Sequence, residues 1–207
     1  MKRIIIKLFM LVITVNLSLC YIGCKNWEYN TERNGIQFKK ISQSKSGTII
    51  GYMIEDNNIQ GFPCEKGWIH FKPDWQLKSF QLSEEIIFRG TLLPAHTWIH
   101  FRHHEKQIGY ICSFPGDYEV QGYVCGGSGG YKGIHTGFYE SGKLRSFYPP
   151  EDVMVDGVPC EETPFVNVNL YENGKIKSCK LADDYQVYGH TYKKGKIIEF
   201  DDSGIVK

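Results

Sequence analysis

Apolar and polar residues alternate with period two along most of this chain, and glycine-centred turns interrupt the alternation at intervals of about thirty residues. Trp68-Ile69-His70-Phe71 is followed one interval later by Trp98-Ile99-His100-Phe101, the same four residues in the same order. Side chains alternate across a strand, so the isoleucine and phenylalanine of each motif face one side, and the tryptophan and histidine face the other. The pattern predicts β-strands with one apolar face and one solvated face.

A short phrase that ends in glycine recurs at the same interval and divides the chain into units. Its glycines are Gly61, Gly90, Gly122, Gly157 and Gly189. Five residues before each glycine stands an acid: Asp56, Glu85, Asp117, Asp152 and Asp184. An apolar residue recurs at the end of each motif strand: Phe71, Phe101, Phe138, Leu170 and Phe200. A period of this length is typical of one small structural unit stacked several times, with the shared apolar row buried.

The segments between strands have the composition of turns. Residues 139–143 and 171–175 each place glycine and lysine after a tyrosine and an acid, and residues 72–76 occupy the same position in an earlier unit. Asn-Gly and related pairs favour tight hairpins, and the acidic residues at the next turn can bond to the local backbone. No sustained helical period occurs beyond the N-terminus, so the sequence predicts an all-β fold, a meander of antiparallel hairpins.

Two of these turns also carry a resemblance. Phe138-Tyr-Glu-Ser-Gly-Lys-Leu-Arg-Ser and Leu170-Tyr-Glu-Asn-Gly-Lys-Ile-Lys-Ser resemble MORN-type (membrane occupation and recognition nexus) repeats, as found in bacterial lipoproteins and antitoxin-like repeat proteins. The likeness covers roughly residues 50 to 206, although each unit here is about twice as long and the second unit lacks the turn glycine. The resemblance implies a repeat solenoid used for scaffolding, lipid association or partner binding, with no catalytic residues.

The first residues have the composition of an export signal. A basic start is followed by an apolar run that ends at Gly23-Cys24, which predicts a signal peptide over 1–23 and a lipid anchor on Cys24. Cys20 is the rival processing site, and a plain cleaved signal or an uncleaved anchor remains open. Residues 24–47 are polar and predict a tether, followed by the repeat domain over 48–207.

Charge excludes one class of partner. Removing residues 1–23 takes away Lys2, Arg3 and Lys7 and no acid, so the formal charge falls from +1 to −2. A nearly neutral surface gives no electrostatic reason to expect nucleic acid binding.

Five cysteines follow Cys24 and occupy two equivalent positions of the repeat: Cys64, Cys112, Cys125, Cys160 and Cys179. Other units place Leu93, Phe80 or Phe147 there, which indicates that the cysteines are small buried hydrophobes. A bond between Cys160 and Cys179, or between Cys112 and Cys125, is the alternative. No Cys-x-x-Cys pair indicates a zinc site.

The candidate binding surface lies on the solvated face of two adjacent units. Trp68 and His70 beside Trp98 and His100 would form an aromatic shelf for a sugar ring, a peptide or a protein. The alternative is that the tryptophans lie over the sheet edge or beneath the polar segment before residue 48.

Two other groups of residues, a set of histidines and the recurring acids, are interpreted as structural rather than metal-binding. His96 and the pair His103-His104 would lie at opposite ends of one strand, about 20 Å apart at roughly 3.3 Å per residue, so no shared metal is expected. The recurring acids lack the glycine-rich nonapeptides of calcium-binding rolls.

Gly126-Gly-Ser128-Gly-Gly130 matches the pattern of a hydrolase nucleophile, but the residues after Ser128 are not helical, which favours an inserted loop.

Taken together, these patterns predict a non-enzymatic binding or scaffolding module without a cofactor or metal. We expect it to be anchored by lipid to a bacterial membrane, the outer rather than the inner, where its partner would be another envelope protein or a glycan. Two alternatives remain: an envelope hydrolase that uses Ser128 with a histidine such as His135, and an antitoxin-like immunity protein.

Overall fold

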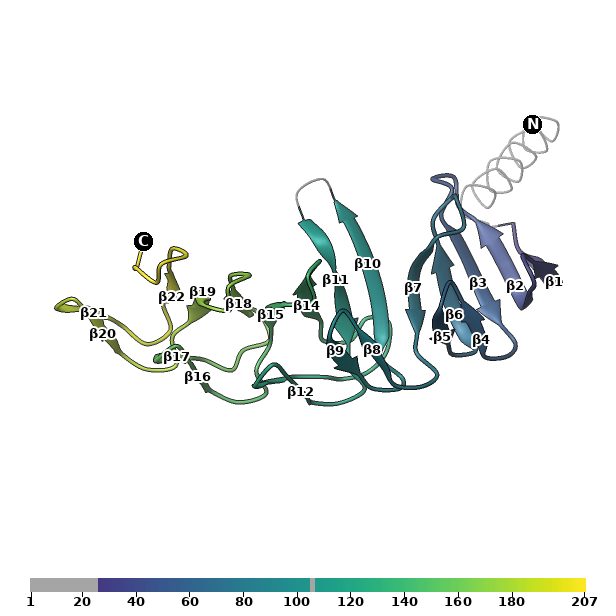
Figure 1. Ribbon diagram of the computed structural model, residues 1–207. Helices are drawn as coiled ribbons and strands as arrows, with labels where there is room; N and C mark the ends of the chain where they lie inside the picture. The colour runs from purple at the N-terminus through teal and green to yellow at the C-terminus, as the bar shows by residue number, and fades with distance from the viewer. Residues whose placement is uncertain (1–25, 105–106) are drawn as a thin grey trace, which may run out of the picture.

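The computed structural model describes residues 26–104 and 107–207, and within them the chain is all-β (Figure 1). Twelve strands form one antiparallel meander in which each strand pairs with the next along the sheet. These strands are β1 (Glu28–Arg33), β2 (Ile36–Gln43), β3 (Ile49–Met53), β6 (Gly67–Phe71), β7 (Leu77–Gln81), β10 (Trp98–His104), β11 (Gln107–Ser113), β14 (Thr136–Tyr139), β15 (Leu144–Phe147), β18 (Val168–Leu170), β19 (Ile176–Lys180) and β22 (Ile197–Glu199). The predicted meander of hairpins is confirmed.

Five short hairpins follow one another along one margin of this sheet, at the bottom of the view in Figure 1. They are β4 (Asn57–Ile59) with β5 (Phe62–Cys64), β8 (Ile86–Phe88) with β9 (Thr91–Leu93), β12 (Tyr118–Val120) with β13 (Tyr123–Cys125), β16 (Val153–Val155) with β17 (Val158–Cys160), and β20 (Tyr185–Val187) with β21 (His190–Tyr192). Each unit of the repeat is therefore a pair of sheet strands joined to the next pair through one short hairpin.

The recurring glycine is explained by the turn at the tip of each short hairpin. Asp156 and Gly157 have φ angles of 50° and 79°, and the four equivalent pairs are also left-handed at both positions. Two consecutive positive φ values define the type I′ turn, whose twist matches that of the flanking strands. Glycine adopts this conformation without steric cost, so the glycine sets the period of the sequence.

The core lies between the main sheet and the short hairpins. Phe71, Phe138, Leu170 and Phe200 are buried there, and Phe101 is partly buried against them. Val120 and Val155 come to the same cluster from the short hairpins. The apolar face predicted from the period-two pattern is therefore the inner face of the sheet, and the opposite face is the outer face.

In three of the five units, the residue before the turn glycine ties the two layers together. The side-chain amide of Gln121 accepts a hydrogen bond from Leu144 N–H at 3.0 Å and donates one to the Gly142 carbonyl at 2.8 Å. Gln60 and Asp156 make the corresponding bond to the main-sheet turn of their own units. The short hairpins are held to the sheet by directional bonds as well as by apolar burial.

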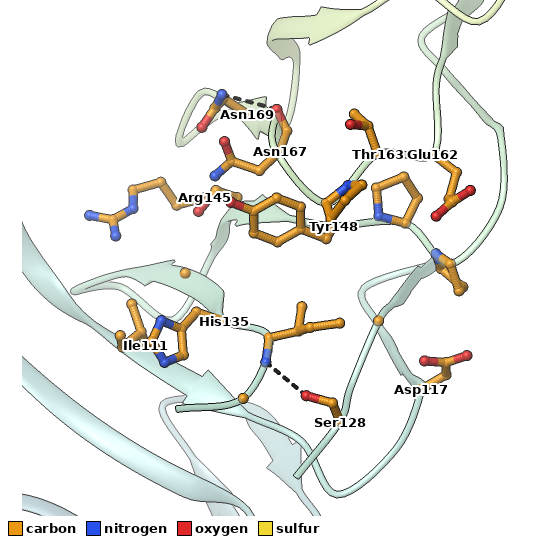
Figure 2. Close-up of a pocket in the computed structure, with 18 of the residues that line it drawn as sticks. Ile111, Asp117, Ser128, His135, Arg145, Tyr148, Glu162, Thr163, Asn167 and Asn169 are labelled. Carbon is orange, nitrogen blue, oxygen red and sulfur yellow. Dashed lines mark hydrogen bonds between the residues drawn. The ribbon is translucent and has the colours of Figure 1, made fainter. Parts of the chain in front are cut away.

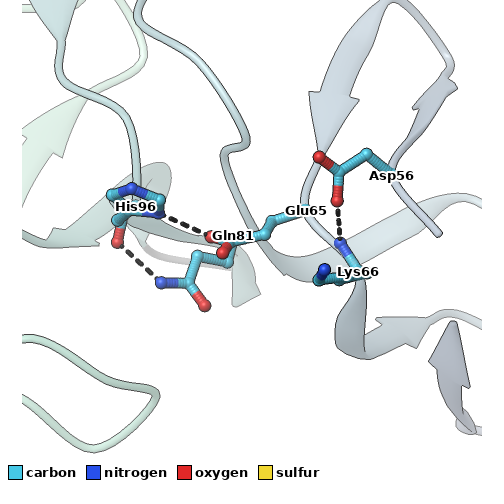
Figure 3. Close-up of polar contacts among 5 residues, drawn as sticks. All are labelled: Asp56, Glu65, Lys66, Gln81 and His96. Atoms are coloured by element: carbon cyan, nitrogen blue, oxygen red, sulfur yellow. Dashed lines mark hydrogen bonds and ion pairs between the residues drawn. The ribbon is translucent and has the colours of Figure 1, made fainter. Parts of the chain in front are cut away.

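The recurring acid closes the base of the short hairpin. Asp56 Oδ1 accepts a hydrogen bond from the backbone N–H of Lys66, ten residues later, at 2.7 Å (Figure 3). The same bond recurs in three other units, as Asp117–Gly127, Asp152–Glu162 and Asp184–Lys194. The acids therefore have the predicted role of bonding the local backbone. Beside the first of them, Glu65 contacts His96 Nδ1 at 2.9 Å (Figure 3).

The predicted tether differs from the structure over most of its length. β1 and β2, between Glu28 and Gln43, form the first hairpin of the main sheet, and Phe38 of β2 is buried in the core. The polar composition reflects an edge strand: β1 is almost fully exposed, and charged edge strands resist pairing with other chains. The signal peptide and Cys24 lie outside the described residues. Among the residues that are described, no helix has the length and hydropathy of a membrane span.

Candidate functional site

The structure places the four residues of the predicted aromatic shelf on the outer face, but it does not expose them together. Trp68 and His70 lie on β6, and Trp98 and His100 lie on β10. Trp68 is 40% exposed, whereas Trp98 is only 5% exposed. The expectation of two exposed tryptophans is therefore wrong for Trp98.

Tyr131 explains the burial of Trp98. Its ring lies 5.3 Å from the Trp98 ring, 5.0 Å from His100 and 4.8 Å from His70, centroid to centroid. Tyr131 belongs to the connection between β13 and β14, which crosses back over the outer face. Three of the four residues predicted to bind a partner thus pack against an inserted loop of the same chain.

Trp68 packs in the other direction, toward the N-terminal strands. The Trp27 ring lies 6.0 Å from it, the Tyr52 ring lies 5.3 Å from it, and the ammonium of Lys40 lies 4.7 Å from its ring centroid. This arrangement agrees in part with the alternative, in which the segment before residue 48 covers the tryptophans. The four residues therefore do not form one open shelf: Trp98 is buried, His70 and His100 are half-buried, and Trp68 is exposed in a separate aromatic group.

Two long connections distinguish the third and fourth units from the others. Residues 126–135 link β13 to β14, and residues 161–167 link β17 to β18, whereas only residues 65 and 66 link β5 to β6. Four-residue connections, 94–97 and 193–196, occur in the second and last units. Inserted loops on a regular scaffold are where binding residues are most often found.

A groove of about 1010 Å³ lies between these two insertions (Figure 2). Its polar lining residues include Asp117, Ser128, Lys132, His135, Arg145, Tyr148, Glu162, Thr163, Asn167, Asn169 and Lys177. Sequence reasoning did not identify most of these residues, because each is ordinary in its own strand or loop. The departure of two units from the common connection length is the signal that could have located the groove.

The floor of the groove is a row of neighbouring residues on four adjacent strands. Ile111 of β11 pairs with Gly137 of β14, Gly137 pairs with Ser146 of β15, and Ser146 pairs with Asn169 of β18. Gly137 creates a depression in this row. A Cβ on it would lie 2.5 Å from Ser146 Oγ and 3.0 Å from a guanidinium nitrogen of Arg145.

Arg145 therefore lies across the backbone of β14, over Gly137. The φ angle of Gly137 is not in the left-handed region, so the need for glycine is one of space rather than backbone conformation. The guanidinium also acts on Tyr139, whose pKa is raised mainly by burial and is lowered in part by Arg145. Tyr139 donates a hydrogen bond to the Leu170 carbonyl at 2.8 Å, which ties β14 to β18 beside the floor.

The groove has opposite charges at its two ends. Arg145 and Asn169 lie at one end of the view in Figure 2, Asp117 and Glu162 lie at the other, and the ring of Tyr148 lies between them. Asp117 is fixed by its bond from the Gly127 N–H at 3.0 Å, which leaves further acceptor positions on its carboxylate. Such an arrangement suits an elongated polar ligand with an anionic group at one end.

Ser128 and His135 both line the groove, but the contacts of the serine are structural. Ser128 Oγ accepts a hydrogen bond from the backbone N–H of Ile134 at 3.1 Å and so closes the loop (Figure 2). The ring of His135 packs against that of His100, with centroids 5.5 Å apart. A serine nucleophile requires a base within hydrogen-bonding reach, and the bond that the structure gives to Ser128 Oγ comes from a backbone amide.

The five cysteines within the described residues are buried and free, as the repeat positions predicted. Burial raises the pKa of the Cys64 thiol to about 12, and does the same for Cys125. The pKa of Cys160 is raised first by a hydrogen bond with Cys179 and then by burial. Thiols in this state are unreactive core residues.

Within residues 26–104 and 107–207, no three His, Cys, Asp or Glu side chains are grouped so that they could hold a metal ion. No protein-family model, curated protein or solved structure matches this chain.

Proposed function

We propose that this protein is a non-enzymatic binding module that holds a polar ligand in the groove between its two insertions. The observation that carries the proposal is the position of the groove. It lies where two units of an otherwise regular repeat depart from the common spacing, and it is lined by hydrogen-bonding side chains. The rest of the chain supplies a rigid platform, because its polar turn residues bond to the scaffold itself.

The test is crosslinking and pull-down from intact cells, with a variant that fills the groove. Asn167→Trp places an indole against the groove wall, while Gln186→Trp adds the same bulk on an exposed position of β20, outside the groove. We expect Asn167→Trp to lose the captured partner or ligand and Gln186→Trp to retain it. The same captured species with all three proteins would disprove a binding role for the groove.

The location belongs to the same proposal. The basic and apolar leader over 1–23 and the Gly23-Cys24 junction support export and a lipid on Cys24, and the repeat turns support a MORN-like solenoid. Labelling of cells with an alkyne fatty acid should mark the wild-type protein but not Cys24→Ser. Labelling that persists in Cys24→Ser and is lost in Cys20→Ser would assign the anchor to the rival cysteine.

One observation keeps an envelope hydrolase as the second candidate: Ser128 and His135 line the same groove. A fluorophosphonate probe that reacts with wild-type protein and not with Ser128→Ala would favour this candidate. The third alternative, an antitoxin-like immunity protein, would be supported by co-purification of one small toxic partner.

A further inference from the structure

The groove holds one feature that narrows the class of ligand. We infer, on the basis of the proposed function, that it binds a saccharide bearing a carboxylate, with that carboxylate against Arg145 and the sugar hydroxyls toward Asn167, Asn169 and the acidic end. The inference starts from the position of Arg145 over Gly137.

Arg145 is positioned rather than merely present on the surface. It is half-buried, it lines the groove, and the absence of a side chain on Gly137 leaves room for it across β14. A guanidinium binds a carboxylate through two parallel N–H···O bonds, and its planar donors must be held in place for that geometry. Lys177, another lining residue, adds positive charge two strands away on β19.

The remaining lining residues suit hydroxyl groups. The amide of Asn167 offers both donors and an acceptor, whereas Asn169 donates to the Asn167 carbonyl and to Ser178 Oγ and so offers its amide oxygen as an acceptor. The carboxylates of Asp117 and Glu162 offer acceptors at the far end of the groove. The ring of Tyr148 between them provides an apolar face of the size of a pyranose ring (Figure 2). A cation at one end, acceptors at the other and an aromatic ring between them match an acidic disaccharide or trisaccharide.

The sheet topology argues against an extended peptide as the ligand. A peptide that adds to a sheet needs an edge strand with unpaired backbone groups. The floor strands β11, β14, β15 and β18 all lie inside the twelve-stranded sheet, with a neighbour on each side. The groove therefore presents side chains, not an open strand edge. Its volume of about 1010 Å³ is at the upper end of the range for small-ligand sites.

The test compares matched sugars on the purified full chain in detergent micelles. Isothermal titration would use disaccharides that contain glucuronate, galacturonate or N-acetylneuraminate, each beside its neutral counterpart, together with a phosphorylated disaccharide and an acidic peptide. A charge-assisted bidentate contact predicts that at least one carboxylated sugar binds about tenfold or more tightly than its neutral partner.

Arg145→Gln should remove that preference and leave binding of the neutral sugar in place, which also shows that the variant is folded. Gly137→Ala keeps the arginine but crowds it, so it should weaken binding of the carboxylated sugar as well. Lys78→Gln is the matched control. Lys78 has the same place in the Leu-Lys-Ser-Phe strand of the first unit as Arg145 in its own, and it lies outside the groove lining.

Three outcomes overturn this inference and leave the proposed function standing. These are equal affinity for carboxylated and neutral sugars, preference for the phosphorylated sugar, and binding of the acidic peptide alone, each with crosslinking that still depends on Asn167. If crosslinking does not depend on Asn167 and no probe binds, both the inference and the proposed function fail.

Discussion

The two sides of the main sheet differ in how closely the chain keeps to its repeat. On the inner side, all five short hairpins end in type I′ turns, and four of the five acids make the same backbone bond. On the outer side, two connections are long, one tyrosine crosses over another unit's tryptophan, and a groove is present. The contacts that stabilise the fold recur from unit to unit. The long connections and the groove, which are available for recognition, do not recur.

This difference teaches where to look for function in a repeat of this kind. Residues that recur at equivalent positions, such as the acids and the turn glycines, are used by the scaffold, and of the five acids Asp117 alone also lines the groove. Arg145 is basic like Lys78 at the same position of the first unit, but the neighbouring Gly137 and the two insertions place Arg145 in a groove, whereas Lys78 lies outside it. The context of a residue, not its type, separates the two roles.

The largest expected difference in stability is between alanine variants of one phenylalanine on the inner side of the sheet and one on the outer side. Phe138 is fully buried, with its ring stacked on Tyr110 at 4.7 Å, whereas Phe165 on the outer insertion is 87% exposed. Phe138→Ala should lower the free energy of unfolding by about 3–5 kcal/mol. Phe165→Ala should change it by less than about 0.5 kcal/mol. Urea denaturation of both variants checks the contrast, and similar losses would refute the division of the two faces.

A smaller effect is expected at the repeat glycine itself. Gly157→Ala forces a Cβ into the left-handed region and should cost about 1–2 kcal/mol. Gly116→Ala is the control, because Gly116 has an ordinary φ angle and open space around it, so its stability should be nearly unchanged. Thermal unfolding of the pair measures the difference. Equal melting temperatures would mean that the turn is not the reason for the glycine.

Substitutions on the outer face should change the solvent exposure of Trp98 more than they change the free energy of unfolding. Tyr131→Ala uncovers Trp98, so acrylamide should quench one more of the four tryptophans, while the free energy of unfolding changes by about 1 kcal/mol or less. Tyr188→Ala, at an exposed position of a short hairpin turn, is the control and should leave quenching unchanged. Unchanged quenching in Tyr131→Ala would show that something other than this tyrosine shields Trp98.

The smallest expected effect is that of low pH on the hydrogen bonds of Asp184 in the last short hairpin. Hydrogen bonds from the Lys193 ammonium and the Lys194 N–H lower the pKa of Asp184 below its ordinary value. Between the pKa of Asp184 in the folded chain and its higher, ordinary pKa in the unfolded chain, the unfolded chain binds more protons than the folded chain. The stabilisation by these hydrogen bonds is therefore fully present above the ordinary pKa and is lost as pH falls through the folded pKa. The protection factor of the Lys194 amide, which is its exchange rate relative to the intrinsic rate at the same pH, should therefore fall below about pH 4, since the ordinary Asp pKa is about 3.9. Asp184→Asn should show no such step.

Much of the inner side could be predicted from the sequence, because its determinants are local. Period-two alternation assigned Phe71 and Phe138 to one face, and glycine spacing located the turns. β1 was missed because an exposed edge strand has no apolar row to reveal it, whereas β2 does alternate at Ile36 and Phe38 and lies in a segment whose overall composition is polar. The burial of Trp98 depends on Tyr131, more than thirty residues later, and the role of Gly137 depends on the side-chain position of Arg145. Neither relation leaves a pattern in the sequence.

The meander order of the main sheet has a consequence for how this protein assembles. Because successive sheet strands pair with one another, contacts form between segments that are close along the chain, and little loop-closure entropy opposes them. Each completed unit then offers a template edge to the following one, so structure can spread from any nucleus in single-unit steps. A lesion in one unit would accordingly divide the molecule into two folded stretches instead of unfolding it as a whole.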